Sequence, residues 1–289
     1  MEGETHITPP SYLPILGSIT LLILMIGVGN WLHGNDYASI WIMAGLIGLT
    51  ATVSRWFAVV IWENSTVLKG DKVLDRSMRW SMCWFIFTEI MFFAAFFGVL
   101  FYVRTKVLPQ LSGLVESKIM THLMLWPDFQ GSWPLAKTPN PNLVASPGMV
   151  MGVQGIPALN TAILLLSGVT ITISHLRLIK NKLQSSWYWL CLTILLGFIF
   201  LVMQGVEYGH AYANGLTLSS GIYGNIFFMM TGFHGLHVLI GSIILGVVGM
   251  RMYWGQMSAT SHFAFEAAAW YWHFVDVVWL ALFVFVYWI

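Results

Sequence analysis

The sequence predicts an all-α integral membrane protein with seven transmembrane helices. Of its 289 residues, 57% are hydrophobic and 9% are charged, whereas soluble domains usually carry ~25% charged residues. Seven apolar runs are each long enough to cross a ~30 Å hydrocarbon core as a helix. A net charge of +1 without a basic run excludes nucleic acid as the main partner. Cys83 and Cys191 form no CxxC pair, so neither a disulfide framework nor a thiolate metal site is indicated.

The predicted spans are listed here in chain order: about Pro14–Trp31, Ser39–Trp62, Arg79–Tyr102, Leu159–Ile179, Trp187–Tyr208, Gly221–Met250 and Phe263–Ile289. The N-terminal MEGETHITPPSY is acidic and lacks the basic region of a cleaved signal peptide, so the first run is expected to remain as a span. The segment Lys106–Pro157 separates the third and fourth spans. Its repeated prolines exclude a helix that crosses lipid.

The distribution of lysine and arginine predicts the orientation. With the N-terminus inside, the interior loops hold Lys69, Lys72, Arg76, Arg79, Arg177, Lys180, Lys182 and Arg251. The exterior loops then hold only Arg104, Lys106, Lys118 and Lys137. Basic residues are in excess on the cytoplasmic side of membrane proteins, so we expect the N-terminus inside and the C-terminus outside.

One carboxylate lies near the middle of the third span. Glu89 interrupts the apolar run RWSMCWFIFTEIMFFAAFFGVLFY. An unpaired charge at that depth is costly, so Glu89 is expected to face protein and to keep its proton. Two interpretations follow: a functional carboxyl group, or a structural one that hydrogen-bonds a neighbouring helix.

Other polar residues fall at helical spacing inside the later spans. His234 and His237 are three apart in the sixth span, and Glu266, His273 and Asp276 recur in the seventh. Such groups on facing helices suit a metal or haem site, but intramembrane histidines beside acids also hydrogen-bond between helices, which is the stronger reading. The motif Glu207-x-x-His210 occurs once, at the predicted membrane edge, whereas a di-iron bundle needs it twice.

Several segments together resemble a known family. They are Ser261–Trp288, which contains WYWHFVDVVW, and Thr231–Ser242, with TGFHGLHVLIGS, supported by LLLSGVTITISH, LTILLGFIFLVMQGVEY and FTEIMFFAAFFG. The chain is thereby similar to subunit III of haem-copper (aa3-type) cytochrome c oxidases. The likeness is close over spans three to seven and looser over the first two.

The resemblance implies a V-shaped bundle of two plus five helices: an arm over residues 1–70, and a bundle over 71–289 with the long outer loop at 106–157. It implies a non-catalytic subunit of the oxidase that reduces O2 to water with cytochrome c as donor. Haems and copper would belong to partner subunits, and this chain would bind none. The chain would stabilise subunit I, contact subunit II and small accessory subunits, hold phospholipids and support proton uptake.

The family's lipid contacts have counterparts at Trp56, Glu63, Phe97, Arg251 and Trp270. Arg251 is predicted near the inner interface, where a lipid phosphate would lie. The family's Trp-Trp-Arg-Asp is here Trp56-Phe57-Ala58-Val59, so the lipid contact of that arginine is lost. The family's buried glutamate matches Glu89.

Proton supply is the proposed contribution to turnover. His262 and Glu266, near the predicted inner surface, are candidates for a proton-collecting antenna. The alternatives are a subunit III of a quinol oxidase, a self-contained redox enzyme and a stand-alone transporter; the transporter lacks an internal repeat and a continuous polar path. The expected location is the bacterial inner membrane, with the mitochondrial inner membrane as the alternative.

Overall fold

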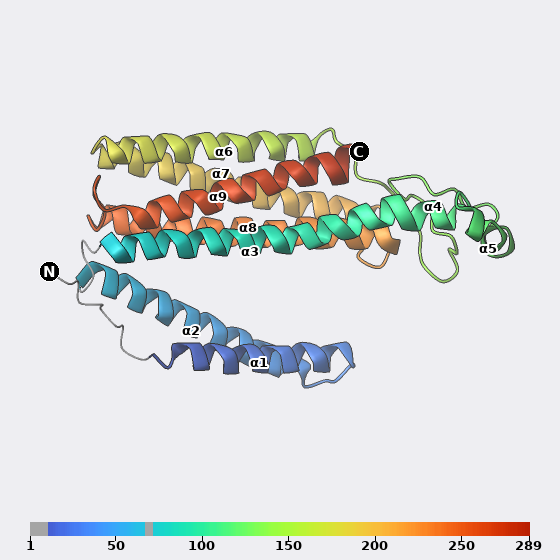
Figure 1. Cartoon of the computed structure of the whole chain (residues 1–289), viewed down its shortest axis with the longest axis horizontal. Helices are drawn as coiled ribbons and strands as arrows, with labels where there is room; N and C mark the ends of the chain where they lie inside the picture. Colours follow the sequence, from blue (N-terminus) through green and yellow to red (C-terminus); the bar gives the residue numbers. More distant parts are fainter. Residues whose placement is uncertain (1–10, 67–71) are drawn as a thin grey trace. The chain divides into compact units, whose positions relative to one another are not determined.

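The computed structural model describes residues 11–66 and 72–289, and the structure over these ranges is helical (Figure 1). The helices are α1 (Leu13–Leu32), α2 (Ala38–Thr66), α3 (Lys72–Tyr102), η1 (Val103–Val107), α4 (Leu108–Leu111), η2 (Glu116–Lys118), α5 (Ile119–Leu125), α6 (Ile156–Ile179), α7 (Leu183–Ala213), α8 (Gly221–Tyr253), α9 (Phe263–Leu282) and η3 (Phe283–Trp288). Lys69, one of the lysines used to predict the orientation, lies outside the described residues.

Seven helical segments in the described ranges are long and apolar enough to cross a membrane, which confirms the predicted all-α membrane class. The third is longer than predicted. It runs from Asp75 to Leu111, because the π-helical turn η1 and the short helix α4 extend α3 beyond Tyr102. Pro109 lies in the first turn of α4, directly after the π-helical turn η1. Lys106 and Pro109 therefore belong to the helix and not to the loop.

The chain divides into two compact units, Met1–Leu74 and Asp75–Ile289. In the first unit, α1 and α2 pack closely because glycines leave room for the opposite backbone. A methyl group on Gly45 would lie 2.5 Å from the Leu24 nitrogen, and one on Gly27 would lie 2.6 Å from the Ile42 nitrogen. The predicted boundary at residue 70 falls in the segment 67–71, outside the described residues.

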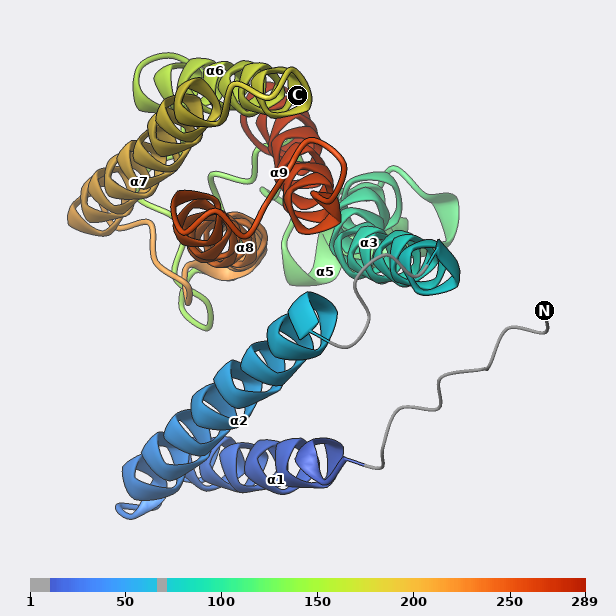
Figure 2. The ribbon, with the colours of Figure 1, turned by 90° about the vertical axis from the view of Figure 1, so that its left-hand side faces the viewer.

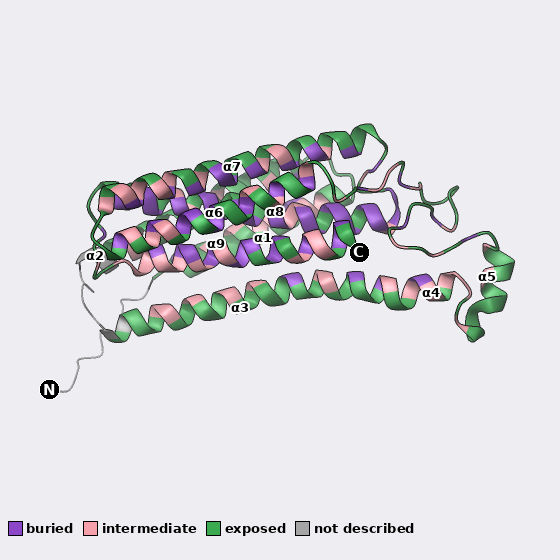
Figure 3. Cartoon of the chain, turned by 90° about the horizontal axis from the view of Figure 1, so that it is seen from above, coloured by how far each residue is buried: buried purple, intermediate pink, exposed green. Residues whose placement is uncertain are grey.

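In the second unit, α6, α7, α8 and α9 pack against one another in an antiparallel arrangement (Figure 2). Buried positions face inward along all four helices, whereas α3 remains largely exposed or intermediate (Figure 3). Side chains rather than close backbones attach α3 to this group. The ring of Phe93 contacts Phe274, Phe92 contacts Phe233, and the Arg104 guanidinium donates to the backbone oxygen of Ile289 at 2.5 Å.

Trp272 fills the centre of the four-helix group. Its side chain is fully buried, and its indole N–H donates to the Ser167 hydroxyl at 2.9 Å. Two glycines make space for the ring: a methyl group on Gly197 would lie 2.6 Å from the indole, and one on Gly241 would lie 3.0 Å from it. Trp272 thereby joins α9 to α6, α7 and α8 at one level of the bundle.

Candidate functional site

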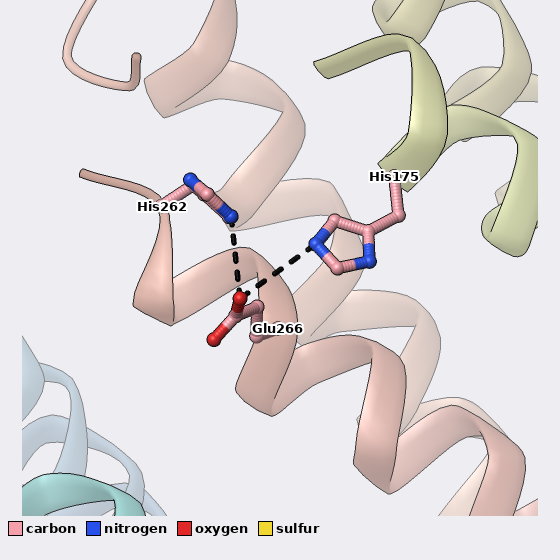
Figure 4. Close-up of side chains that lie close together, drawn as sticks. All are labelled: His175, His262 and Glu266. Carbon is pink, nitrogen blue, oxygen red and sulfur yellow. Dashed lines mark ion pairs between the residues drawn. The ribbon is translucent and has the colours of Figure 1, made fainter. Parts of the chain in front are cut away.

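Three titratable side chains meet at the end of the bundle where α9 begins and α6 ends. Figure 4 shows Glu266 of α9 with His262, which caps the same helix, and His175 near the end of α6. The Nε2 atom of His262 lies 3.2 Å from a Glu266 carboxylate oxygen, and the Nε2 atom of His175 lies 3.8 Å from the same oxygen. Only 16% of the Glu266 side chain is exposed.

Arg79, near the start of α3, supplies the positive charge at this place. Its guanidinium forms an ion pair with Glu266, bonds Asp75 at 2.9 Å and lies over the ring of Phe263, 5.1 Å from its centre. The first turn of α9 adds the positive end of a helix dipole beside the Glu266 carboxylate. We call Glu266, His262, His175 and Arg79 the Glu266 cluster.

Within the Glu266 cluster, one imidazole is close enough to hydrogen-bond the carboxylate, because Nε2 of His262 lies 3.2 Å from a Glu266 oxygen. Nε2 of His175 makes no hydrogen bond to another described residue, since 3.8 Å is too long for one. Ligand atoms of His175, His262 and Glu266 lie within 4.8 Å of one another, so these groups could also hold a divalent metal ion. The positive charge of the neighbouring Arg79 guanidinium would repel such a metal ion.

Glu89 faces protein, as predicted, and its partner is His237 of α8. The Nε2 atom of His237 lies 2.9 Å from a Glu89 carboxylate oxygen. Nδ1 of the same ring lies 2.7 Å from the backbone oxygen of Phe233. The imidazole is enclosed by the rings of Phe92, Phe93 and Tyr271.

These contacts fix how many protons the pair shares. A backbone oxygen can only accept, so Nδ1 of His237 carries a proton and donates it to Phe233. The hydrogen bond between Nε2 and the carboxylate then holds one further proton. That proton lies on Glu89 in a neutral pair, or on His237 in an ion pair. Either form satisfies both groups at mid-span, which accounts for a carboxyl group at this depth.

The histidines at helical spacing do not form one ligand set. His234 is fully buried and turns away from α3, with Nε2 3.1 Å from the backbone oxygen of Val275 and its ring 5.0 Å from that of Trp279. Within the described ranges, the Glu266 cluster is the group with metal-like spacing. His234 and His237 therefore serve separate contacts.

His273 and Asp276 lie side by side on α9, facing α6. Nδ1 of His273 is 3.6 Å from the Asp276 carboxylate, and Nε2 is 3.3 Å from the Thr172 hydroxyl. Gly168 makes room for this carboxylate, because a methyl group there would lie 2.5 Å from its oxygen. The His273 side chain is 45% exposed at the middle of the span, whereas Asp276 is buried.

The five residues matched to lipid contacts lie in different units. Trp56 and Glu63 lie on α2 of the first unit, whereas Phe97, Arg251 and Trp270 lie in the second. Phe97 contacts the ring of Phe285 near one end of the bundle. Arg251 ends α8 at the other end, where its guanidinium bonds Gln256 at 3.2 Å. Their assignment to lipid stays a prediction.

Sequence reasoning missed two members of the Glu266 cluster and the burial of Glu207. His175 and Arg79 complete the Glu266 cluster. The sequence does contain a signal for both residues. Each lies near the end of a span, and because successive spans alternate in direction, these ends lie on the same side of the membrane as the start of α9. Glu207 was placed at the membrane edge, but α7 continues to Ala213 and the Glu207 side chain is 1% exposed.

Comparisons with known proteins give one consistent result. The family model described as "Cytochrome c oxidase subunit III" matches residues 4–115 and 114–289. The chain is 37% identical over 283 residues to cytochrome c oxidase subunit 3 of Oryctolagus cuniculus, which covers 98% of this chain and 96% of the relative. Over 284 residues it is 37% identical to the subunit 3 of Homo sapiens, with the same coverage. The chain therefore belongs to the cytochrome c oxidase subunit III family.

Proposed function

We propose that this chain stabilises the catalytic subunit I of a respiratory terminal oxidase and collects protons for it through the Glu266 cluster. As a family member, the chain is a non-catalytic subunit of this oxidoreductase complex and has no redox centre of its own. In the proposed assembly, haems and copper lie in subunits I and II. Cytochrome c is the donor, as the names of the relatives suggest.

The observation that carries the antenna proposal is the convergence of α3, α6 and α9 on Glu266. Two imidazoles lie 3.2 and 3.8 Å from one carboxylate oxygen, at an end of the bundle where the side chains keep 14 to 27% exposure. His262 is within hydrogen-bond distance of the carboxylate and His175 lies just beyond it, so these partly exposed side chains can pass a proton from water to Glu266 through His262. Basic residues gather at the same end, which supports its assignment to the inner, proton-uptake side.

The location of the partner is supported by His273. A half-exposed imidazole at mid-span is unfavourable against lipid tails, so the face formed by α6 and α9 suits a protein neighbour. We assign subunit I to this face, with subunit II and small accessory subunits further away. Phospholipids are assigned to Trp56, Glu63, Phe97, Arg251 and Trp270. The proposed membrane is the bacterial inner membrane, or alternatively the mitochondrial inner membrane.

Replacing the carboxylate tests the antenna. In the intact oxidase, Glu266→Gln is expected to slow proton uptake several-fold at alkaline pH, where protons are scarce, and to leave it unchanged at acid pH. The measurement is proton uptake followed with a pH dye during turnover. Glu116→Gln, an exposed acid in η2 at the opposite end, is the matched control and should change nothing. Equal uptake by Glu266→Gln and the unmodified oxidase at every pH would rule the antenna out.

A further inference from the structure

Four buried polar side chains lack hydrogen-bond partners at the end of the bundle opposite the Glu266 cluster. Asn160 of α6, Gln204 and Glu207 of α7, and Tyr287 of η3 are each at most 5% exposed. Both amide atoms of Asn160 and Gln204, both carboxylate oxygens of Glu207 and the Tyr287 hydroxyl have no partner among residues 11–66 and 72–289. We call these side chains the outer polar group.

Tyr287, Glu207 and Gln204 of the outer polar group lie together, and Asn160 lies one to two helical turns away from them along α7. The Tyr287 hydroxyl lies beside Glu207 and Gln204, and the Tyr208 hydroxyl lies beside Gln204, close enough for weak hydrogen bonds that fall short of regular hydrogen-bond geometry. The position of Asn160 along the bundle can be derived from the pairing of α6 with α7. In this pair the Ser174 hydroxyl donates to the backbone oxygen of Ser186 at 2.7 Å. Two heptads further along each antiparallel helix, Asn160 lies level with Phe200, one turn from Gln204.

Two neighbouring tyrosine hydroxyl groups, unlike the outer polar group, do have regular hydrogen-bond partners. The Tyr208 hydroxyl bonds Thr231 at 2.7 Å, and the Tyr223 hydroxyl accepts the backbone N–H of Met151 at 3.1 Å. Met151 belongs to the long loop, and Trp133 of the same loop packs against the ring of Tyr223. The loop thus contacts this end of the bundle at Tyr223 of α8.

No regular hydrogen bond within the described residues satisfies these atoms. A buried polar atom left without a hydrogen bond loses the bond it makes to water in the unfolded chain, and native proteins contain few such atoms. Exchanging the O and N of an amide does not help, because both atoms of Asn160 and Gln204 are unpaired. Lipid tails offer no hydrogen bonds, and a single carboxylate is a weak ligand set for a cation. Water both donates and accepts, as this mixture of amides, carboxyl and hydroxyl requires.

We propose that the outer polar group is an internal water-binding site. Buried waters make about three hydrogen bonds each, so the unpaired atoms correspond to about two or three molecules. These waters would link Glu207 to Tyr287 and Gln204 and would extend to Asn160. They would thereby join α6, α7 and η3, beside the direct bond from Trp279 of α9 to Thr161 of α6. The site is separate from the Glu266 cluster and does not depend on the proposed antenna.

A structure of the intact oxidase at about 2 Å resolution tests the site. We expect ordered water density about 2.6–3.2 Å from polar atoms of at least two members of the group. Direct bonds among the four side chains with no density between them would overturn the proposal. So would a lipid or partner side chain filling the space, or a peak with many oxygen ligands near ~2.4 Å, which would mark a cation.

Tyr287→Phe provides the second test, because it removes one hydroxyl and keeps the ring. In the same type of structure we expect one water to be lost or displaced, and the melting temperature of this subunit to fall by a few degrees. Tyr188→Phe, at a side chain that is 58% exposed, is the control and should change neither. If the water densities around Glu207 were the same in Tyr287→Phe as in the unmodified protein, the proposed water-binding site would be contradicted.

Discussion

Trp272→Ala is expected to destabilise the five-helix unit by about 3–5 kcal/mol, the usual cost of removing a large buried aromatic side chain. The change leaves a cavity between Gly197 and Gly241 and removes the donor to the Ser167 hydroxyl. Both effects act at the level where α6, α7, α8 and α9 meet. The measurement is thermal loss of this subunit from the purified oxidase, and the variant should dissociate at a clearly lower temperature.

Two further variants make this expectation specific. Trp272→Phe keeps most of the ring and loses the hydrogen bond to Ser167, so its cost should be smaller, about 1–3 kcal/mol. Trp254→Ala alters a side chain that is 65% exposed after α8 and should have little effect. Equal dissociation temperatures for Trp272→Ala and Trp254→Ala would show that the central tryptophan does not hold the bundle together.

Glu89→Leu is expected to destabilise the contact between α3 and α8 by about 1–3 kcal/mol, because it leaves Nε2 of His237 buried without a partner. Few backbone contacts attach α3 to the rest of the unit, so the loss should weaken its docking. Limited proteolysis of the intact oxidase in lipid nanodiscs measures this, and cleavage at the start of α3 should become faster.

Glu89→Gln is the matched control for that variant. Its amide N–H can donate to Nε2 of neutral His237, so the hydrogen bond and the protease resistance should be retained. The haem absorbance should be unchanged in both variants, because this subunit has no redox centre of its own. A loss of haem absorbance in Glu89→Gln would count against the non-catalytic assignment.

The number and order of the spans could be predicted because each apolar run is long enough to cross a membrane by itself. The protein-facing position of Glu89 was also predictable, since the cost of exposing a carboxyl group to lipid leaves few alternatives. The end of the third span was not predictable. A run that contains Lys106 and Pro109 resembles a loop in sequence. In the structure the helix continues through these residues, because the π-helical turn η1 leads directly into α4, which contains the proline.

The partners of the polar residues depend on helix rotation, which spacing alone does not determine. His234 and His237 are three residues apart, yet one bonds Val275 of α9 and the other bonds Glu89 of α3. Glu207 occurs near the end of its span, and it lies beside Tyr287 of η3, which is distant in sequence. The sequence alone could identify His262 and Glu266 as neighbours on one helix. That Arg79 and His175 contact them became clear only from the packing of α3, α6 and α9.

The most direct measurement compares the intact oxidase with the same complex after this subunit has been removed. Our account predicts unchanged haem spectra, slower proton uptake at alkaline pH and a shorter active lifetime during turnover, because the subunit carries no redox centre and supports its catalytic neighbour. Loss of a haem or copper signal in proportion to the removed chain, or identical uptake and lifetime at every pH, would contradict it.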